Sequence, residues 1–401
     1  MLSCVEYIWL DGTKPTQQLR SKTRVTRIES DPVANPSILP TWGFDGSSTE
    51  QAPGNDTDLV LQPVCSLPDP LRGSLRDLAF SPESSSILSG GPFAAKGLDT
   101  SERFERTRNV ASKAPQGPQP PSGRGNHYLV LCEVLNTDGS PHSSSTRARL
   151  REQLQAEWSA WRPWIGFEQE YTLFQGERPY GWPQGGIPGP QGRFYCGVGA
   201  HCAYGRALVE RHLRACLAAG LCIFGVNAEV MPSQWEFQVG YRGLGDPREE
   251  DLLTMCDHTW LARWLLLRLG EEFGITVNFS PKPLTGDWNG AGAHTNFSTQ
   301  AMRNPQGGWE VLQKFTQALA AHHQEHIDCY GVDLDRRLTG KHETCRIDSF
   351  KAGERDRGAS VRIPHTVAQA RCGYIEDRRP GANCDPYRVC HRLLQTYATI
   401  A

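Results

Sequence analysis

Short apolar runs that end at turn residues characterise the first third of the chain. Residues 5–10 (VEYIWL) are apolar and aromatic and stop at an Asp-Gly pair, and residues 59–64 and 128–134 repeat this pattern. Runs of this length and composition, bounded by turn residues, are typical of β-strands. The pattern therefore predicts a β-rich N-terminal domain over residues 1–140.

Helical periodicity appears further along the chain. The segments 203–219, 257–273 and 309–329 carry apolar residues three and four positions apart, and the first two stop at Gly220 and Gly274. Apolar residues at this spacing predict helices that bury one face, and a glycine directly after them predicts where each helix ends.

One more helix is expected near residues 146–160, and glycine-punctuated short strands recur from about residue 165. Strands and helices that are mixed in this way favour an α+β fold. We therefore predict a second, larger domain over residues 141–401, with an antiparallel sheet backed by helices.

The residues between the second and third predicted strands, about 66–126, have a different composition. Their final part, residues 111–125, holds four prolines and three glycines. Such a segment cannot bury enough apolar surface to offset the entropy lost on ordering. It is interpreted as a mobile insertion in the N-terminal domain.

Composition and charge narrow the possible functions. The chain has 401 residues, and its 42 Lys+Arg nearly cancel its 44 Asp+Glu, giving a net charge of −2. No global basic field would attract nucleic acid or an anionic membrane. The start of the chain lacks a secretory signal, and no apolar run is long enough to span a bilayer. We expect a cytoplasmic protein whose 13 cysteines are mostly buried, reduced thiols.

Acidic residues interrupt several strand-like segments. Glu168 and Glu170 are two positions apart, so they share one face of a strand, and Glu229 and Glu236 lie within apolar runs. Like charges on one sheet face are unfavourable unless a cation lies between them. The alternative is that these acids pair with arginines of neighbouring strands. Oxygen-rich ligation points to Mg²⁺ or Mn²⁺, with His294 and Glu376 as further candidate ligands.

No glycine-rich P-loop is present, so a bound nucleotide would need metals and arginines to hold its phosphates. Arg337, Arg357, Arg362 and Arg378 could do so, because guanidinium groups match carboxylate and phosphate oxygens in pairs. The alternative is that each arginine is a solvated surface charge. His322 and His326 are at helical spacing, but their segment is otherwise polar, which favours a solvated face over a metal pair.

Several long segments resemble glutamine synthetase of the eukaryotic branch. They include GFDGSSTEQAPG, FEQEYTLF, NAEVMPSQWEFQVG, DWNGAGAHTNFST, RRLTGKHET and YIEDRRPGANCDP, and the likeness covers nearly the whole chain outside the insertion. The resemblance implies an N-terminal β-grasp domain followed by a catalytic domain with a funnel-shaped site. It also implies a homo-oligomer, a decamer of two stacked rings, with each site built between neighbouring subunits.

The resemblance assigns roles to individual residues. The implied first metal site consists of Glu170, Glu229 and Glu236, and the second of Glu168, His294 and Glu376. Implied contacts to glutamate or the transferred phosphoryl group are Asp287, Trp288, Asn289, Gly290, Arg337, Arg357 and Arg378. Implied nucleotide contacts are Glu168, Glu236, Phe237, Gln238, Asn296, Phe297, Ser298, Arg357, Arg362, Tyr374, Ile375 and Glu376. Asp45, offered by the adjacent subunit, would bind and deprotonate ammonium, and Glu343 would close a flap over the site; with Arg337 and Arg357, they form the implied catalytic group.

The implied activity is ligation of ammonia to L-glutamate at the expense of ATP, through a γ-glutamyl phosphate. Two alternatives are a non-catalytic structural or regulatory relative and a ligase that uses another amine. The chain departs from the family in its short N-terminus, which bears on ring stacking, and in a widened loop at 241–249. Single-residue departures occur at His201, Cys202, Leu334, Glu354, Arg355, Asp356 and His365. None of these removes an implied metal ligand.

Overall fold

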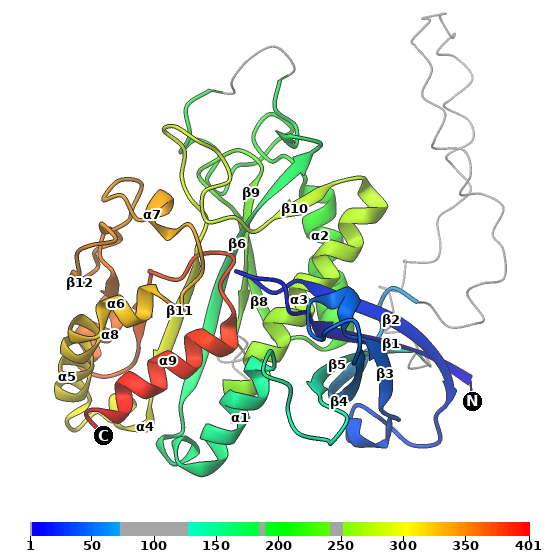
Figure 1. Ribbon diagram of the computed structural model, residues 1–401. Coiled ribbons are helices and arrows are strands. Elements are labelled where there is room, and N and C mark those ends of the chain that lie inside the picture. The colour runs from blue at the N-terminus through cyan, green and yellow to red at the C-terminus, as the bar shows by residue number, and fades with distance from the viewer. Residues whose placement is uncertain (1, 73–126, 184–188, 241–251) are drawn as a thin grey trace, which may run out of the picture.

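A computed structural model describes residues 2–72, 127–183, 189–240 and 252–401. Within these ranges the chain forms two β-sheets, with helices around the larger one (Figure 1). This mixed content confirms the predicted α+β class. The interior of the expected insertion, 73–126, and the loop 241–249 lie outside the described residues.

The N-terminal sheet has five strands in the order β2-β1-β5-β4-β3. The strands are β1 (Leu2–Leu10), β2 (Leu19–Arg27), β3 (Trp42–Asp45), β4 (Asp58–Pro68) and β5 (Tyr128–Leu135). β1 and β5 pair in parallel, and the other neighbours are antiparallel. Sequence reasoning found β1, β4 and β5 but missed β2, because no residue of that edge strand is fully buried and its sequence is mostly polar.

The insertion was expected to start at about residue 66, and the strand before it extends slightly further. β4 continues through Pro68, which pairs with Tyr128 of β5. Beyond it, Arg72 donates to Asp69 and Glu6, each at 2.8 Å. The sheet therefore includes Ser66, Leu67 and Pro68, because these residues still pair with β5.

The larger sheet has the path β12-β13-β14-β11-β6-β9-β8, and β7 and β10 also pair with β6. Its strands are β6 (Trp164–Gln175), β7 (Arg178–Pro179), β8 (Ile223–Ala228), β9 (Gln234–Val239), β10 (Thr276–Asn278), β11 (Ala293–Ser298), β12 (Ala352–Glu354), β13 (Val361–Ile363) and β14 (Ile375–Asp377). All pairs are antiparallel except β12–β13. The predicted antiparallel sheet is confirmed with that one exception.

The helices are α1 (Thr146–Ala156), α2 (Arg206–Ala219), α3 (Leu252–Phe273), α4 (Gln300–Arg303), α5 (Gly308–Ala321), α6 (His323–Ile327), α7 (Leu334–Arg337), α8 (His365–Ala370) and α9 (Pro386–Ala398). Gly220 ends α2 and Gly274 follows α3, as expected. The prediction of a single helix over 309–329 is wrong, since His322 interrupts the helical segment and separates α5 from α6. α9 was not predicted, although Asp385 accepts from the N–H of Tyr387 and proline follows it, which is a helix-start signature.

Side chains alternate across β6 and divide it into two chemically different faces. Phe167, Gln169 and Tyr171 are fully buried, whereas Glu168 and Glu170 point to the opposite side. α3 packs on the buried face with Leu261 and Leu265, and α1 and α9 lie side by side beyond it (Figure 1). The helices therefore supply the core and leave the other sheet face for polar side chains.

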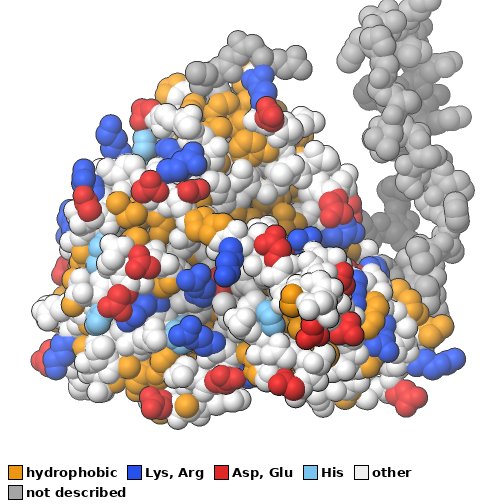
Figure 2. All heavy atoms as spheres, in the orientation of Figure 1, with side chains coloured by type: hydrophobic (Ala, Val, Ile, Leu, Met, Phe, Trp, Pro, Cys, Tyr) orange, Lys and Arg blue, Asp and Glu red, His pale blue; other side chains and the backbone are white. Residues whose placement is uncertain are grey.

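The outer surface carries both signs of charge. In the face shown in Figure 2, Lys and Arg side chains are interspersed with Asp and Glu. No helix among the described residues is both long and apolar enough to cross a membrane.

Candidate active site

Strand register places polar residues in a continuous row on the face of the larger sheet that lies opposite the core residues of β6. Paired residues of neighbouring strands point to the same face, so each pair below contributes to one row. The pairs are Arg362–Glu376, Glu376–Asn296, His294–Glu168, Glu168–Gln238, Glu170–Glu236 and Glu236–Asn227. Segments that are up to about 200 residues apart in the chain thus meet on one surface because of the sheet topology.

A cavity of about 340 Å³ lies over this row. It is lined by Glu168, Glu170, Tyr195, Asn227, Glu229, Val230, Glu236, Gln238, Asn289, Gly290, His294, Arg337, His342, Glu343, Thr344, Arg357, Arg362 and Arg378. Glu376 lies directly beside it and is only 1% exposed. The cavity is therefore lined by five of the six expected metal ligands and by the four expected arginines, and the sixth ligand, Glu376, forms ion pairs with two of those arginines, Arg362 and Arg378.

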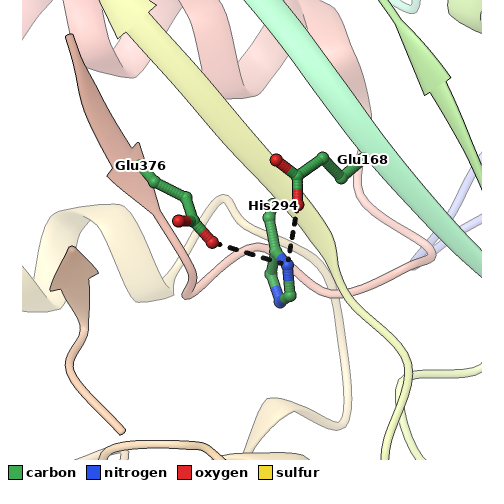
Figure 3. Close-up of side chains that lie close together, drawn as sticks. All are labelled: Glu168, His294 and Glu376. Carbon is green, nitrogen blue, oxygen red and sulfur yellow. Dashed lines mark ion pairs between the residues drawn. The ribbon is translucent and has the colours of Figure 1, made fainter. Parts of the chain in front are cut away.

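Figure 3 shows one group of possible metal ligands, drawn from three strands. His294 of β11 points its Nδ1 toward Glu168 of β6, at 3.5 Å from Oε2, and toward Glu376 of β14, at 3.8 Å from Oε1. Their donor atoms lie within 4.8 Å of one another. Burial and the nearby Arg378 hold the pKa of His294 well below its usual range, so the ring is neutral and able to bind a cation.

A second group shares His294 and adds Glu170 and Glu236, again with donor atoms within 4.8 Å. Glu229, expected in this set, is not among the three residues whose donor atoms all lie within 4.8 Å of one another. Its carboxylate follows the end of β8 and accepts from the side chain of Asn227 at 2.8 Å and from the N–H of Val230 at 3.2 Å. These local bonds hold Glu229 at the cavity wall.

The carboxylates are crowded in a way that a cation would relieve. Burial, followed by repulsion from Glu170, raises the pKa of Glu229 to about 8. Burial and the charges of Glu168, Glu170 and Glu229 raise the pKa of Glu236 to about 9. Among the described residues, no arginine lies within ion-pair distance of Glu229 or Glu236, so the salt-bridge alternative fails for these two acids.

The alternative of a salt bridge with arginines on neighbouring strands holds for Glu376. Arg362 and Arg378 donate to its two oxygens, each at 2.5 Å. Arg337 is buried, and its NH1 donates to the carbonyl oxygens of Arg378 and Arg379, while burial lowers its pKa to about 10. Arg337 and Arg378 are each 5% exposed, so the interpretation as solvated surface charges is wrong for both.

The small-residue loop before His294 makes room for Arg337. A Cβ built on Gly290 would lie 2.7 Å from Cγ of Arg337, and one on Gly292 would collide with its guanidinium group. Close approach to this arginine therefore explains Gly292, and Gly290 is required both by Arg337 and by the carbonyl oxygen of Pro281, 2.5 Å from its added Cβ. Asn289 and Gly290 line the cavity, whereas the side chain of Asp287 is 93% exposed and reaches His342. Trp288 packs its ring against Trp182, with the ring centroids 4.9 Å apart.

The expected nucleotide contacts divide by strand face. Asn296 donates to Glu168 at 2.9 Å, and Gln238 donates to Glu236 at 2.7 Å, so both lie on the cavity side. Ser298 accepts from Arg303 at 2.9 Å, and Tyr374 is 37% exposed. The side chains of Phe237, Phe297 and Ile375 are fully buried in the core. Because they point away from the row, only their backbone atoms are available to a ligand.

Of the two expected catalytic acids, Glu343 lies at the cavity and Asp45 does not. Glu343 lines the cavity, 3.9 Å from Arg378. Asp45 lies exposed at the end of β3 and is not among the lining residues of its own chain. The hydroxyls of Ser47 and Ser48 donate to its carboxylate and hold its pKa below the usual value.

Sequence reasoning missed five lining residues: Tyr195, Asn227, Val230, His342 and Thr344. Asn227 and Val230 flank Glu229, and His342 and Thr344 flank Glu343, so proximity to a candidate acid was the signal available. The solvated-face interpretation of His326 is wrong. Its ring is buried between the hydroxyls of Tyr330, at 2.6 Å, and Thr396, at 2.8 Å, which also leaves no nitrogen for a metal.

The fold and the cavity define an α+β enzyme whose site combines carboxylates with arginines. The family described as glutamine synthetase, catalytic domain, matches residues 143–396. Over 98% of its length, the chain is 46% identical to a glutamine synthetase of Streptomyces hygroscopicus and to the chloroplastic glutamine synthetase of Chlamydomonas reinhardtii, covering 96% and 89% of those proteins. It is 44% identical to a glutamine synthetase of Hebeloma cylindrosporum, of which it covers 92%. The chain belongs to the glutamine synthetase family.

Proposed function

We propose that this cavity is the active site of a glutamate–ammonia ligase. ATP transfers its γ-phosphoryl group to the side-chain carboxylate of L-glutamate, and ammonia then displaces phosphate from the γ-glutamyl phosphate to give L-glutamine. The observation that carries the proposal is a single cavity lined both by a row of carboxylates with His294 and by Arg337, Arg357, Arg362 and Arg378. Such a site matches a polyanionic nucleotide beside a carboxylate substrate.

The donor set fits divalent cations, because Glu229 and Glu236 are crowded carboxylates without an arginine partner among the described residues. Glu168, His294 and Glu376 would hold one ion, and Glu170, Glu229 and Glu236 the other. Oxygen-rich ligation favours Mg²⁺ or Mn²⁺. When bound, the ions would offset the negative charge of the ATP phosphates and of the phosphoryl group in transfer.

The arginines and the loop 287–290 position the substrates. Arg337, Arg357 and Arg378 would bind glutamate and the transferred phosphoryl group, and Arg362 a nucleotide phosphate, since their planar groups match these oxygens two at a time. Asp287, Trp288, Asn289 and Gly290 would form the glutamate-binding loop. On the adenine side, Asn296, Ser298, Gln238 and Tyr374 would act through side chains, and Phe237, Phe297 and Ile375 through backbone atoms.

Asp45 would bind and deprotonate ammonium, and Glu343 would exclude water from the site. Ammonium must lose a proton before it can attack, and a carboxylate is suited to accept that proton. Asp45 lies away from the cavity of its own chain, which supports its donation to a neighbouring copy in a homo-oligomer, proposed as a decamer of two stacked rings. Glu343 would close over the cavity and keep water from the acyl phosphate. We propose a cytoplasmic location, which cell fractionation would test.

Phosphate release tests this function. Purified protein receives ATP, Mg²⁺ and glutamate with and without ammonium, and its mass in solution is measured alongside. Ammonium-dependent phosphate release with equal glutamine formation is expected from a large assembly, and Glu168→Ala should abolish it. Absence of release from a folded assembly would instead favour a non-catalytic relative. Release that depends on an amine other than ammonium would favour the other ligase.

A further inference from the structure

Two loops that meet at the cavity are joined by a histidine without an assigned role. His342 precedes Glu343 in residues 339–346, called here the flap loop, which Thr339 and Arg346 close by pairing with each other. Its side chain is only 18% exposed and lines the cavity. Each ring nitrogen is connected, directly or through one other side chain, to residues 287–290, called here the substrate loop.

The first connection is direct, and the second passes through an amide. Nε2 of His342 lies 3.0 Å from Oδ1 of Asp287. Nδ1 lies 3.2 Å from the amide nitrogen of Gln191, whose amide oxygen accepts from the backbone N–H of Asn289 at 2.9 Å. His342 therefore holds both a side chain and, through Gln191, the backbone of the substrate loop.

The connections agree on one protonation pattern. The oxygen of Gln191 is committed to the N–H of Asn289, so the amide group facing His342 can only donate. Nδ1 of His342 must then accept, and the ring proton lies on Nε2, where it is donated to Asp287. One tautomer of the His342 ring therefore satisfies the hydrogen bonds at both of its nitrogens.

The backbone of the flap tip depends on such contacts. His342 and Glu343 have φ angles of 52° and 58°, in the left-handed region that side-chain-bearing residues seldom adopt. Such a turn persists only where its surroundings hold it. Arg378 contributes one contact, to the carbonyl oxygen of Glu343 at 3.5 Å, and His342 contributes the two connections to the substrate loop.

We propose that His342 is a positioning residue that couples the substrate loop to the flap, so that glutamate bound at residues 287–290 fixes Glu343 over the cavity. The inference rests on the proposed function. Without His342, the flap opens while the acyl phosphate is present, and water replaces ammonia in the attack. The acyl phosphate then returns to glutamate and phosphate, so ATP is consumed without glutamine.

The test compares His342→Ala, His342→Gln and a control, Lys341→Ala, which alters an exposed side chain of the same loop. Phosphate and glutamine are measured together at saturating ATP, Mg²⁺, glutamate and ammonium. His342→Ala should release at least two phosphates per glutamine and raise the KM for glutamate about tenfold. His342→Gln, which can still donate to Asp287, should restore part of the coupling. Lys341→Ala should release one phosphate per glutamine, as the unaltered chain does.

A unit ratio and an unchanged KM in His342→Ala would overturn the proposal. Hydrogen exchange of the flap-loop amides, measured without substrates, tests the coupling independently of activity. Faster exchange at residues 339–346 in His342→Ala, but not in Lys341→Ala, is expected, and equal exchange would overturn the inference. An unaltered chain that releases no phosphate but shows this exchange difference would refute the proposed function alone.

Discussion

At the scale of single residues, the site stores unfavourable electrostatic energy that ligands would release. Glu229 and Glu236 lie in a buried, acid-rich environment, which raises the pKa of the first to about 8 and of the second to about 9. These raised pKa values favour the protonated carboxyls, and a divalent cation that binds there would displace the protons. Binding of metal and loss of protons are therefore linked.

Replacement of Glu236 by glutamine tests this linkage. Glu236→Gln keeps the shape and removes the charge, so metal affinity should fall at least tenfold while the fold is retained. Calorimetric titration with Mn²⁺ in buffers of different ionisation enthalpy would also show fewer protons released per ion bound. Glu310→Gln, on the exposed face of α5, should bind metal like the unaltered chain. Equal metal affinity in the two variants would contradict the assignment.

The same residues predict how the stability of the metal-free protein depends on pH. A carboxyl whose folded pKa is raised stabilises the fold most below its unfolded pKa, near 4.5, and loses that contribution as pH rises through 8 to 9. Urea unfolding with a chelator should therefore show falling stability between pH 6 and pH 9. Mg²⁺ should reduce the slope, and so should Glu236→Gln. If stability falls with pH equally in the metal-free protein, with Mg²⁺ and in Glu236→Gln, then Glu236 is not the source of the pH dependence.

At the scale of elements, strand register and the close approach of loops decide what the site contains. β6 presents acids on one face and core residues on the other, and the loop before β11 leaves space for Arg337 through two glycines. Helix α3, which packs against the other face of the sheet, anchors β6 from behind through Arg263. Arg263 of α3 is 2% exposed and donates to the side chain of Gln169 and the carbonyl of Cys384, each at 2.8 Å.

A methyl group at Gly292 should act through Arg337. Gly292→Ala places a Cβ against the guanidinium group, which must move from its bonds to the carbonyls of Arg378 and Arg379. Activity should fall at least tenfold with little change in the unfolding midpoint. In a double-mutant cycle, Gly292→Ala should cost almost nothing in an Arg337→Ala background. Additive losses would show that the glycine serves another purpose.

Removal of Arg263 should destabilise the large domain. Arg263→Ala leaves the buried oxygens of Gln169 and Cys384 without their donor, at an expected cost of about 3 kcal/mol or more. Arg268→Ala on the same helix is the matched control, because its ion pair with Glu271 is exposed and should change stability by less than about 0.5 kcal/mol. Urea unfolding measures both. Equal costs would mean that the buried bonds contribute no more than the surface pair.

At the scale of the whole molecule, Asp45 and the cavity belong to different parts of the chain. Asp45 ends an edge strand of the N-terminal sheet, whereas the cavity lies on the larger sheet. The proposed reaction needs both. A homo-oligomer that places the N-terminal sheet of one copy against the cavity of another would satisfy this requirement.

Subunit mixing tests the shared site. Asp45→Ala and Glu168→Ala should each be inactive alone, since each lacks one part of every site. Unfolding and refolding of an equal mixture should restore about a quarter of the normal activity, because random assembly gives that share of sites both intact parts. Recovery should fail when either variant is refolded alone. No recovery from a mixture that assembles to normal mass would show that each chain builds its site by itself.

The sequence by itself determined the features that depend on neighbours along the chain. The two-residue spacing of Glu168 and Glu170 was enough to place both on one strand face, and glycine was enough to end α2 at Gly220. Family-specific strings supplied the candidate ligands and arginines. These predictions succeeded because backbone periodicity and chain termination are local properties.

The tertiary structure decided which partners those local elements meet. It buried Phe237, Phe297 and Ile375 in the core, and it joined His294 to two groups of acids while leaving Glu229 at the wall. It also gave His342 its two connections to the substrate loop. No local pattern contains this information, because strand order and loop contacts arise from pairing between segments that are distant in the sequence.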